Sequence, residues 1–105
     1  MVKGMKMLSL SEIFGKRAAI IEEFFESGRD LSRTEIADGT GLSMKLVYDV
    51  VSDFLRKGVL TKTRTVGKAE FYKLDKSNPL VRKMAEYELM RLGKLEDKTE
   101  LVQVE

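Results

Sequence analysis

The sequence contains no cysteine, no histidine and no tryptophan, and it has a single proline. Without cysteine there is no disulfide. Without cysteine or histidine, zinc and copper sites of the usual kind cannot be built. Nucleophilic dyads and triads that use either residue are excluded for the same reason. We therefore expect no metal site, no cofactor and no enzymatic activity.

Long hydrophobic runs and a strong charge of one sign are also missing. The longest apolar runs fall far short of the ~20 residues that a membrane span requires. The first six residues have no apolar core that would suit a signal peptide. The net charge is only +2 over 105 residues. These features predict one small cytoplasmic domain with no membrane partner.

Positive charge is concentrated in one part of the chain. Between Arg56 and Lys76 there are seven basic and two acidic residues, a net charge of +5. Residues 93–105 have a net charge of −2. A local excess of basic residues is typical of a nucleic-acid contact.

The first predicted helix begins at Ser9. Ser9 and Glu12 have the spacing of a capping box, and apolar residues follow at helical spacing over 13–25. Two adjacent apolar stripes predict a helix buried on two sides. Its acidic residues, Glu22 among them, are expected in water, and Gly28 is expected to end it.

The next two predicted helices form a helix-turn-helix. Ser32 and Glu35 repeat the capping-box spacing and start a short helix. Gly41 permits a positive φ at the turn, Ser43 caps a longer helix, and Gly58 ends that helix. The inward face of the longer helix is expected to consist of Val47, Val50, Val51 and Phe54.

A β-hairpin and a fourth helix are predicted to follow. Residues 59–65 and 69–74 are rich in β-branched and aromatic side chains, and Gly67 suits the turn between them. Tyr72 and Leu74 share a face and are expected to point inward. Asn78 and Pro79 then fit the cap and first position of a helix over 79–92.

The predicted fold class is therefore α+β and mainly helical. We expect a winged helix-turn-helix with an N-terminal helix and a C-terminal dimerisation helix. The domain is expected to span residues 9–92, with a flexible arm at 1–8 and a polar tail at 93–105.

Six short motifs carry a family resemblance over residues 10–92. They are Ile13-Phe14-Gly15-Lys16-Arg17, Glu35-Ile36-Ala37, Thr40-Gly41-Leu42-Ser43, Leu55-Arg56-Lys57-Gly58-Val59-Leu60, Phe71-Tyr72-Lys73-Leu74 and Asn78-Pro79-Leu80. The chain resembles the small winged-helix transcriptional regulators common in archaea, within the arsenic-repressor-like and multiple-antibiotic-resistance-repressor-like group. The resemblance implies a homodimer that binds palindromic DNA and regulates transcription.

The DNA contacts are predicted from three places. The longer helix, about 43–57, is expected in the major groove, and the wing, about 61–69, on the backbone or in the minor groove. The start of the short helix is expected to hold a phosphate. The predicted contact residues are Arg33, Thr34, Ser43, Met44, Lys45, Tyr48, Asp49, Ser52, Arg56, Lys62, Arg64 and Lys68.

Two of these predictions have an open alternative. Asp49 and Asp53 place carboxylates on the expected outward face of the recognition helix, where phosphates repel them. Asp49 suits either a cytosine amino group or an ion pair with Lys45. The basic wing suits either DNA or a solvated edge hairpin that resists aggregation.

Apolar residues on the first and fourth helices predict a symmetric dimer, with packing of the fourth helix on its own domain as the alternative. The predicted interface residues are Ile13, Phe14, Leu80, Met84, Tyr87, Leu89 and Met90. The favoured function is a homodimeric DNA-binding regulator, a repressor in particular. The alternative is a protein-interaction winged helix of the transcription machinery, which lacks DNA specificity of its own.

Overall fold

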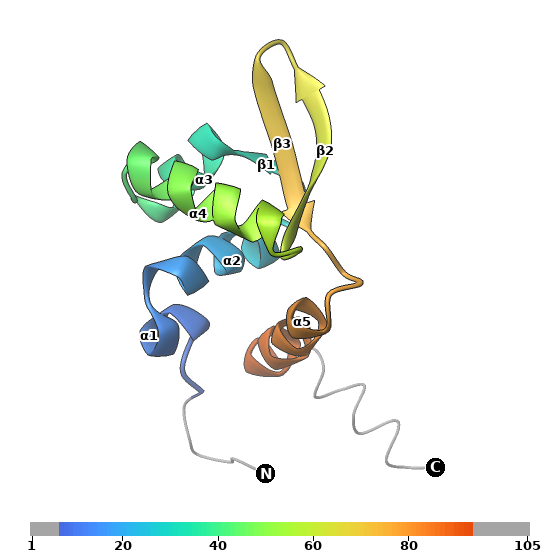
Figure 1. Ribbon diagram of the computed structural model, residues 1–105. Coiled ribbons are helices and arrows are strands. Elements are labelled where there is room, and N and C mark those ends of the chain that lie inside the picture. The colour runs from blue at the N-terminus through green and yellow to red at the C-terminus, as the bar shows by residue number, and fades with distance from the viewer. Residues whose placement is uncertain (1–6, 94–105) are drawn as a thin grey trace.

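The computed structural model describes residues 7–93 of the chain. The predicted arm at 1–8 and tail at 93–105 lie almost entirely outside the described residues. The elements run in the order α1 (Leu10–Phe14), α2 (Lys16–Ser27), β1 (Leu31–Ser32), α3 (Arg33–Thr40), α4 (Met44–Arg56), β2 (Leu60–Val66), β3 (Ala69–Leu74) and α5 (Pro79–Arg91). The β2–β3 hairpin projects from the helical body, and α1 and α5 lie at the end opposite its tip (Figure 1).

Capping side chains begin the helices where the sequence predicts. Ser9 and Ser32 each accept a hydrogen bond from the backbone N–H three residues on, and each completes a capping box. Ser43 accepts from the N–H of Leu46, and Asn78 accepts from that of Leu80. Such caps satisfy backbone donors that have no partner inside the helix.

The prediction of one continuous helix from Ser9 to Gly28 is wrong, because Gly15 divides it into α1 and α2. Gly15 has φ +84° and ψ −153°, a conformation available essentially to glycine alone. The two apolar stripes are therefore interrupted. Ile13 and Phe14 are 50% and 70% exposed, whereas Ile20 and Phe24 on α2 are buried in the core.

The break at Gly15 also explains the wrong prediction that Glu22 lies in water. Because α1 turns back beside α2, the backbone N–H of Ser11 donates to Glu22 Oε2 at 3.2 Å. Glu22 is buried as a result. Its carboxylate supplies a partner for one of the N–H groups that the start of α1 leaves without an intrahelical acceptor.

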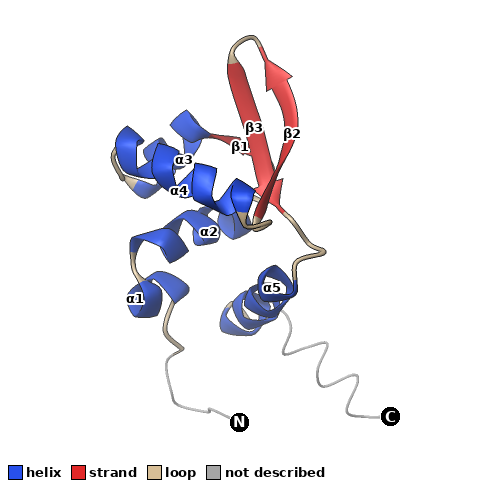
Figure 2. Ribbon diagram, viewed as in Figure 1, coloured by secondary structure: helices blue, strands red, loops and turns tan. Residues whose placement is uncertain are grey.

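The three strands form an antiparallel sheet in the order β1–β3–β2 (Figure 2). Strand β2 begins one residue later than predicted, and it pairs with β3 from Leu60 opposite Leu74 to Val66 opposite Ala69. The register shifts between Lys62 and Arg64, which leaves Thr63 out of the regular pairing. The predicted positive φ at the hairpin turn is confirmed, since Gly67 has φ +62°.

The core lies between α2, α3, α4 and the sheet, with one contribution from α5. The predicted inward face of α4 and the predicted inward residues of β3 are all buried. The core residues with the lowest exposure are Ile20, Leu31, Ile36, Val47, Val50, Val51, Tyr72 and Val81. Because the inward face of α4 is buried in this core, the opposite face of α4 is turned outward. No helix within residues 7–93 is long and apolar enough to cross a membrane.

Candidate nucleic-acid interface

The outward face of α4 presents polar and amphipathic side chains to solvent. Lys45 and Asp49 have side chains that are 89% and 66% exposed. Met44 and Tyr48 are 47% and 56% exposed, and Ser52 is half-buried. We call these five residues the recognition face. Together they offer a cation, an aromatic hydroxyl, a carboxylate and an aliphatic hydroxyl, which are groups suited to base edges and phosphates.

Of the two alternatives for Asp49, the ion pair with Lys45 is present in the structure. Lys45 Nζ lies 3.6 Å from Asp49 Oδ2, one helical turn away. An exposed pair of this spacing contributes only about 0.3–0.5 kcal/mol. The pair is therefore weak enough to open when another partner approaches either side chain.

Asp53 does not belong to the recognition face, and its predicted outward position is wrong. Asp53 is buried against α2, where Arg17 Nη1 donates to its Oδ2 at 2.8 Å. Lys57 Nζ lies 3.1 Å from the same carboxylate, and Arg56 also donates to it. The hydrogen bond from Arg17, and then the one from Lys57, lower the pKa of Asp53. Arg56 and Lys57, at the end of α4, are thus paired with a buried carboxylate of the protein itself.

Arg33 connects three elements at the start of α3. Its guanidinium lies over the rings of Tyr48 at 4.3 Å and Tyr72 at 5.1 Å, and 3.9 Å from Glu70. Its Nε is buried and has no hydrogen-bond partner within the described residues. Thr34, the other predicted phosphate contact, is exposed. Arg33 therefore holds an aromatic side chain of the recognition face against the base of the wing.

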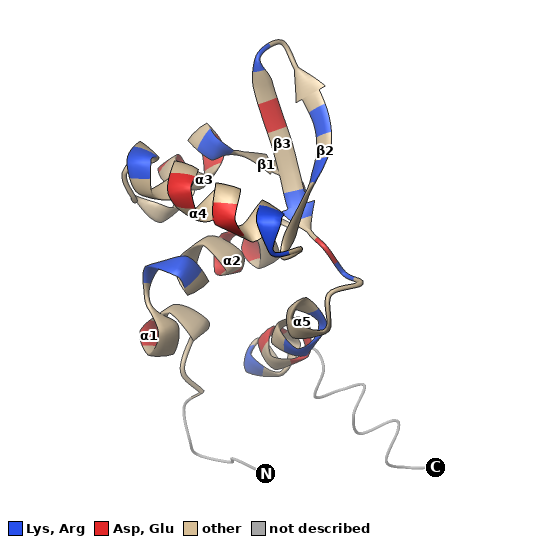
Figure 3. Cartoon of the chain, in the orientation of Figure 1, with Lys and Arg blue, Asp and Glu red and all other residues tan. Residues whose placement is uncertain are grey.

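Positive charge follows the wing strands and both ends of α4 (Figure 3). Lys62 Nζ lies 3.7 Å from Glu70, and Arg64 Nε lies 2.9 Å from Asp30. Lys68, beside the turn, has no ion-pair partner within residues 7–93. The wing cations therefore differ: Lys62 and Arg64 are paired, whereas Lys68 and Lys73 have no ion-pair partner within residues 7–93.

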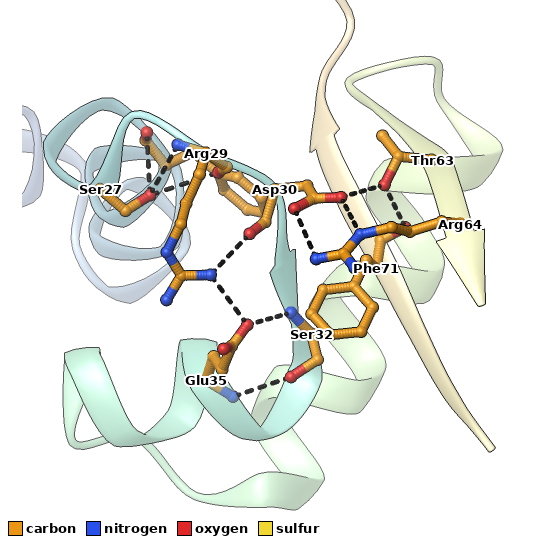
Figure 4. Close-up of polar contacts among 9 residues, drawn as sticks. Ser27, Arg29, Asp30, Ser32, Glu35, Thr63, Arg64 and Phe71 are labelled. Atoms are coloured by element: carbon orange, nitrogen blue, oxygen red, sulfur yellow. Dashed lines mark hydrogen bonds and ion pairs between the residues drawn. The ribbon is translucent and has the colours of Figure 1, made fainter. Parts of the chain in front are cut away.

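Asp30 is the residue at this surface that sequence reasoning missed. It accepts hydrogen bonds from Thr63 Oγ1 at 2.6 Å, Arg64 Nε at 2.9 Å and Arg64 Nη2 at 3.3 Å (Figure 4). These hydrogen bonds lower the pKa of Asp30 to about 2, with Arg64 the largest cause. No local spacing indicates the contact, because Asp30 and Arg64 are 34 residues apart.

The end of the molecule opposite the wing tip exposes large apolar side chains among charged ones. We call these side chains of α1, α5 and the flanking residues the apolar end face; they are Leu8, Ile13, Phe14, Leu80, Leu89, Met90 and Leu92. Between α1 and α5 the apolar end face contains a groove of about 310 Å³, lined by Leu10, Ile13, Phe14, Lys83, Met84 and Tyr87. Met84 and Tyr87 are half-buried, and the hydroxyl of Tyr87 donates to the backbone oxygen of Leu8 at 2.6 Å.

The carboxylates within residues 7–93 do not form a metal-binding cluster. No three carboxylates in this part of the chain come together in a way that could hold a metal ion. The buried acids are instead engaged by arginine or lysine, or by a backbone N–H group, as described for Asp53 and Glu22.

Comparison with known proteins identifies the architecture. No family model matches the sequence, and no curated protein matches it either. Solved structures do match. AdcR, the adhesin competence repressor of Streptococcus pyogenes, superimposes with a TM-score of 0.56 at 16% identity, over 81% of this chain and 63% of AdcR. The transcriptional regulator PcaV of Streptomyces coelicolor, solved in complex with its natural ligand, gives 0.54 at 19% identity, over 84% and 69% of the two chains.

The chain has the winged helix-turn-helix fold. The M. tuberculosis protein Rv0081 shares it, with a TM-score of 0.54, 21% identity and 79% coverage of both chains. In this fold α3 and α4 are the helix-turn-helix and β2–β3 is the wing. The predicted fold class is thereby confirmed.

Proposed function

We propose that this winged helix-turn-helix protein is a homodimeric, sequence-specific DNA-binding regulator that acts in the cytoplasm, a repressor in particular. One observation carries the proposal: α4 turns an exposed polar face outward beside a basic hairpin. Lys45, Tyr48 and Ser52 on that face are chemically suited to base edges and phosphates, and α4 is the helix that enters the major groove in this fold.

The wing supplies the part of the affinity that does not depend on the DNA sequence. Its available cation, Lys68, lies beside the turn, and Lys62 is only loosely paired at 3.7 Å. Cations on such a hairpin can follow a phosphate backbone or enter the minor groove. The recognition face, with Asp49 within it, contributes selectivity more than affinity.

Dimerisation rests on the apolar end face. Seven large apolar side chains are exposed there at the end of the molecule opposite the wing. Large apolar side chains exposed at one end of a molecule suit an interaction site, and a two-fold axis makes one such surface complementary to itself. Two recognition helices in such a dimer would contact a palindrome whose half-sites lie about 10–11 bp apart or a multiple of that distance.

A salt titration tests DNA binding. If the dimer engages ~6–10 phosphates, the affinity for duplex DNA falls by about three to five decades between 50 and 200 mM salt. Fluorescence anisotropy with a randomised duplex pool measures this dependence. A flat salt response, or no binding to any pool, contradicts the proposal.

Selection from a random pool tests the roles within the interface. Lys45→Ala, Tyr48→Phe or Ser52→Ala changes the selected sequence, because these side chains belong to the recognition face. Lys68→Ala weakens binding to all sequences about equally and reduces the salt slope. If the recognition-face variants leave the selected sequence unchanged, α4 does not contact base edges.

The second candidate is a protein-interaction module of the transcription machinery. It is favoured by the ion pairs of Lys45, Lys62 and Arg64 with neighbouring acids, which leave less free positive charge than the sequence suggested. Gel filtration combined with the DNA titration separates the two. A monomer without DNA affinity fits only this second candidate.

A further inference from the structure

The outer part of the wing has almost no core of its own. Along β2 only Leu60 is buried, and residues 61–66 are exposed. On β3 the buried residues are Tyr72 and Leu74, both at the end near the helical body. A two-stranded hairpin without a hydrophobic face is at best marginally stable in water. Something other than apolar burial must therefore hold the wing at a fixed angle.

A polar bridge crosses all three strands at the base of the wing. Asp30 directly precedes β1, Phe71 lies on the central strand β3, and Arg64 lies on the outer strand β2. Arg64 is paired with Phe71 in the register, and its guanidinium lies 4.1 Å from the centre of that ring. The same guanidinium reaches on to Asp30 with two hydrogen bonds (Figure 4).

The bridge is attached where the sheet is irregular. The register of β2 against β3 shifts between Lys62 and Arg64, so Thr63 is the extra residue. Its hydroxyl donates to Asp30 at 2.6 Å and lies 3.2 Å from the backbone oxygen of Phe71. A bulge bends the strand that contains it. Asp30 thus binds two successive residues at the bend that sets the direction of the wing.

Asp30 is itself held on the side of the helical body. Arg29 Nη1 donates to the backbone oxygen of Asp30 at 3.0 Å and to Glu35 at 3.3 Å, and Glu35 completes the capping box of α3 (Figure 4). The contacts therefore run without interruption from the first turn of the helix-turn-helix to the outer wing strand.

We propose that Asp30 is a positioning residue that fixes the wing relative to the helix-turn-helix, and that Arg64 acts through Asp30 as the anchor of the wing instead of as a phosphate contact. The effect on DNA rests on the proposed function, whereas the effect on the wing does not. The phosphate contacts of the wing then belong to Lys68 and Lys62.

The decisive variant is Asp30→Asn, because the two possible roles of Asp30 predict opposite changes in affinity. If Asp30 were only an acid near DNA, its neutralisation would tighten binding. As a positioning residue it is needed for the correct wing angle, and Asp30→Asn weakens binding to duplex DNA roughly three- to tenfold at one salt concentration. Thr63→Val removes one donor without changing any charge, and it gives a smaller loss in the same direction.

Arg64→Ala and Lys68→Ala form a matched pair, since each removes one positive charge from the wing. Lys68→Ala reduces the slope of log affinity against log salt by about 0.9 per subunit, or about 1.8 for the dimer, as expected for one lost phosphate contact in each wing. Arg64→Ala weakens binding but leaves the slope unchanged, and the double variant with Asp30→Asn is no weaker than Arg64→Ala alone. Tighter binding by Asp30→Asn, or an equal slope change in both members of the pair, overturns the proposal.

Amide hydrogen exchange in the free protein separates this proposal from DNA binding itself. In Asp30→Asn, residues 61–70 exchange several-fold faster while α4 keeps its protection, which also shows that the variant is folded. If amide exchange in residues 61–70 is unchanged in Asp30→Asn, Asp30 does not anchor the wing. Faster exchange in a protein that binds no DNA supports the anchor and contradicts the proposed function.

Discussion

Tyr72 shows how one side chain can join the core to a charged surface. Its ring is fully buried, and its hydroxyl donates to Glu70 Oε1 at 2.8 Å. Burial of the phenol and this hydrogen bond both disfavour the phenolate, and they raise the pKa of Tyr72 to about 12. The hydrogen bond in turn is the main reason that the pKa of Glu70 is lowered.

Tyrosinate absorbance measures this effect. In the unfolded chain Tyr72 ionises near pH 10. In the folded protein one of the three tyrosines ionises near pH 12, and that step is absent from Tyr72→Phe. Because the folded value is the higher one, Tyr72 contributes stability below about pH 10, which is lost as the pH rises towards 12. Titration of all the tyrosines near pH 10 would contradict the burial described for this ring.

Asp49 is the acid that most directly opposes phosphate binding by the recognition face. Asp49→Asn removes one negative charge and frees Lys45 from its weak pair. We expect binding to non-specific duplex DNA to tighten about twofold, since the charge acts through screened solvent. Loss of preference for one base pair in the same variant would show that Asp49 reads a cytosine. Weaker binding to every sequence would contradict both roles.

Local chemistry was predictable at the residue scale, whereas long-range partners were not. The caps at Ser9, Ser32 and Ser43 depend on residues three positions away, so the sequence displays them. Arg64, which binds Asp30, is 34 residues away from it, and Arg17, which joins Asp53 to α2, is 36 residues away. No periodicity indicates such contacts, because they arise only when packing brings distant segments together.

At the scale of elements, Asp53 joins α4 to α2. Its carboxylate lies under Arg17 of α2 and faces the last turn of its own helix, where Lys57 and Arg56 bind it. Arg17 also lies 5.5 Å from the centre of the Phe54 ring. Polar and aromatic contacts therefore hold the end of α4 that is furthest from Lys45.

Asp53→Asn tests this connection through its dependence on pH. The folded pKa of Asp53 is lowered, so the carboxylate contributes stability above about pH 4, the unfolded value, which is lost as the pH falls through the folded value. Thermal melts at pH 7 should show Asp53→Asn less stable than wild type by several degrees, with the difference shrinking towards pH 3. Asp49→Asn, on the same helix but exposed, is the control. Its free energy of unfolding should lie within about 0.5 kcal/mol of the wild-type value. A pH-independent difference would contradict the role of the charge.

The break between α1 and α2 at Gly15 explains the main error of the sequence prediction. The apolar spacing continues through residue 15, and periodicity alone cannot distinguish a bent pair of helices from a single one. Gly15 in a helical pattern only lowers helix propensity by about 1 kcal/mol, which many helices tolerate. The turn that buries Glu22 is decided by packing of α1 on α2, which lies beyond local propensity.

At the scale of the molecule, the two ends differ in chemistry. The wing and the recognition face are polar and charged, whereas α1 and α5 expose large apolar side chains among charged ones. Amphipathic spacing on the helices and a count of basic residues are enough to predict where apolar and basic side chains are exposed. They could not show that Lys62 and Arg64 of the wing are paired with acids.

Substitution on the apolar end face tests dimerisation. Phe14→Glu and Met90→Glu, at side chains 70% and 47% exposed, should each raise the dimer dissociation constant at least about tenfold, because a buried central apolar residue commonly contributes about 2 kcal/mol or more. Val66→Glu is the control, since Val66 is 54% exposed at the wing. Sedimentation velocity measures the effect. Equal dimer strength in all three variants would place the subunit contact elsewhere.

The conformation of Gly15 limits which sequences can encode this arrangement. At φ +84° and ψ −153° no side chain is tolerated without strain, whereas Gly41, at φ +76° and ψ +10°, has a left-handed conformation that asparagine also adopts. In a library randomised at both positions and screened for stable folding, position 41 should accept asparagine and position 15 should return glycine alone. Position 15 therefore requires glycine because of its backbone conformation alone, since a Cβ placed there would meet no atom within 4 Å.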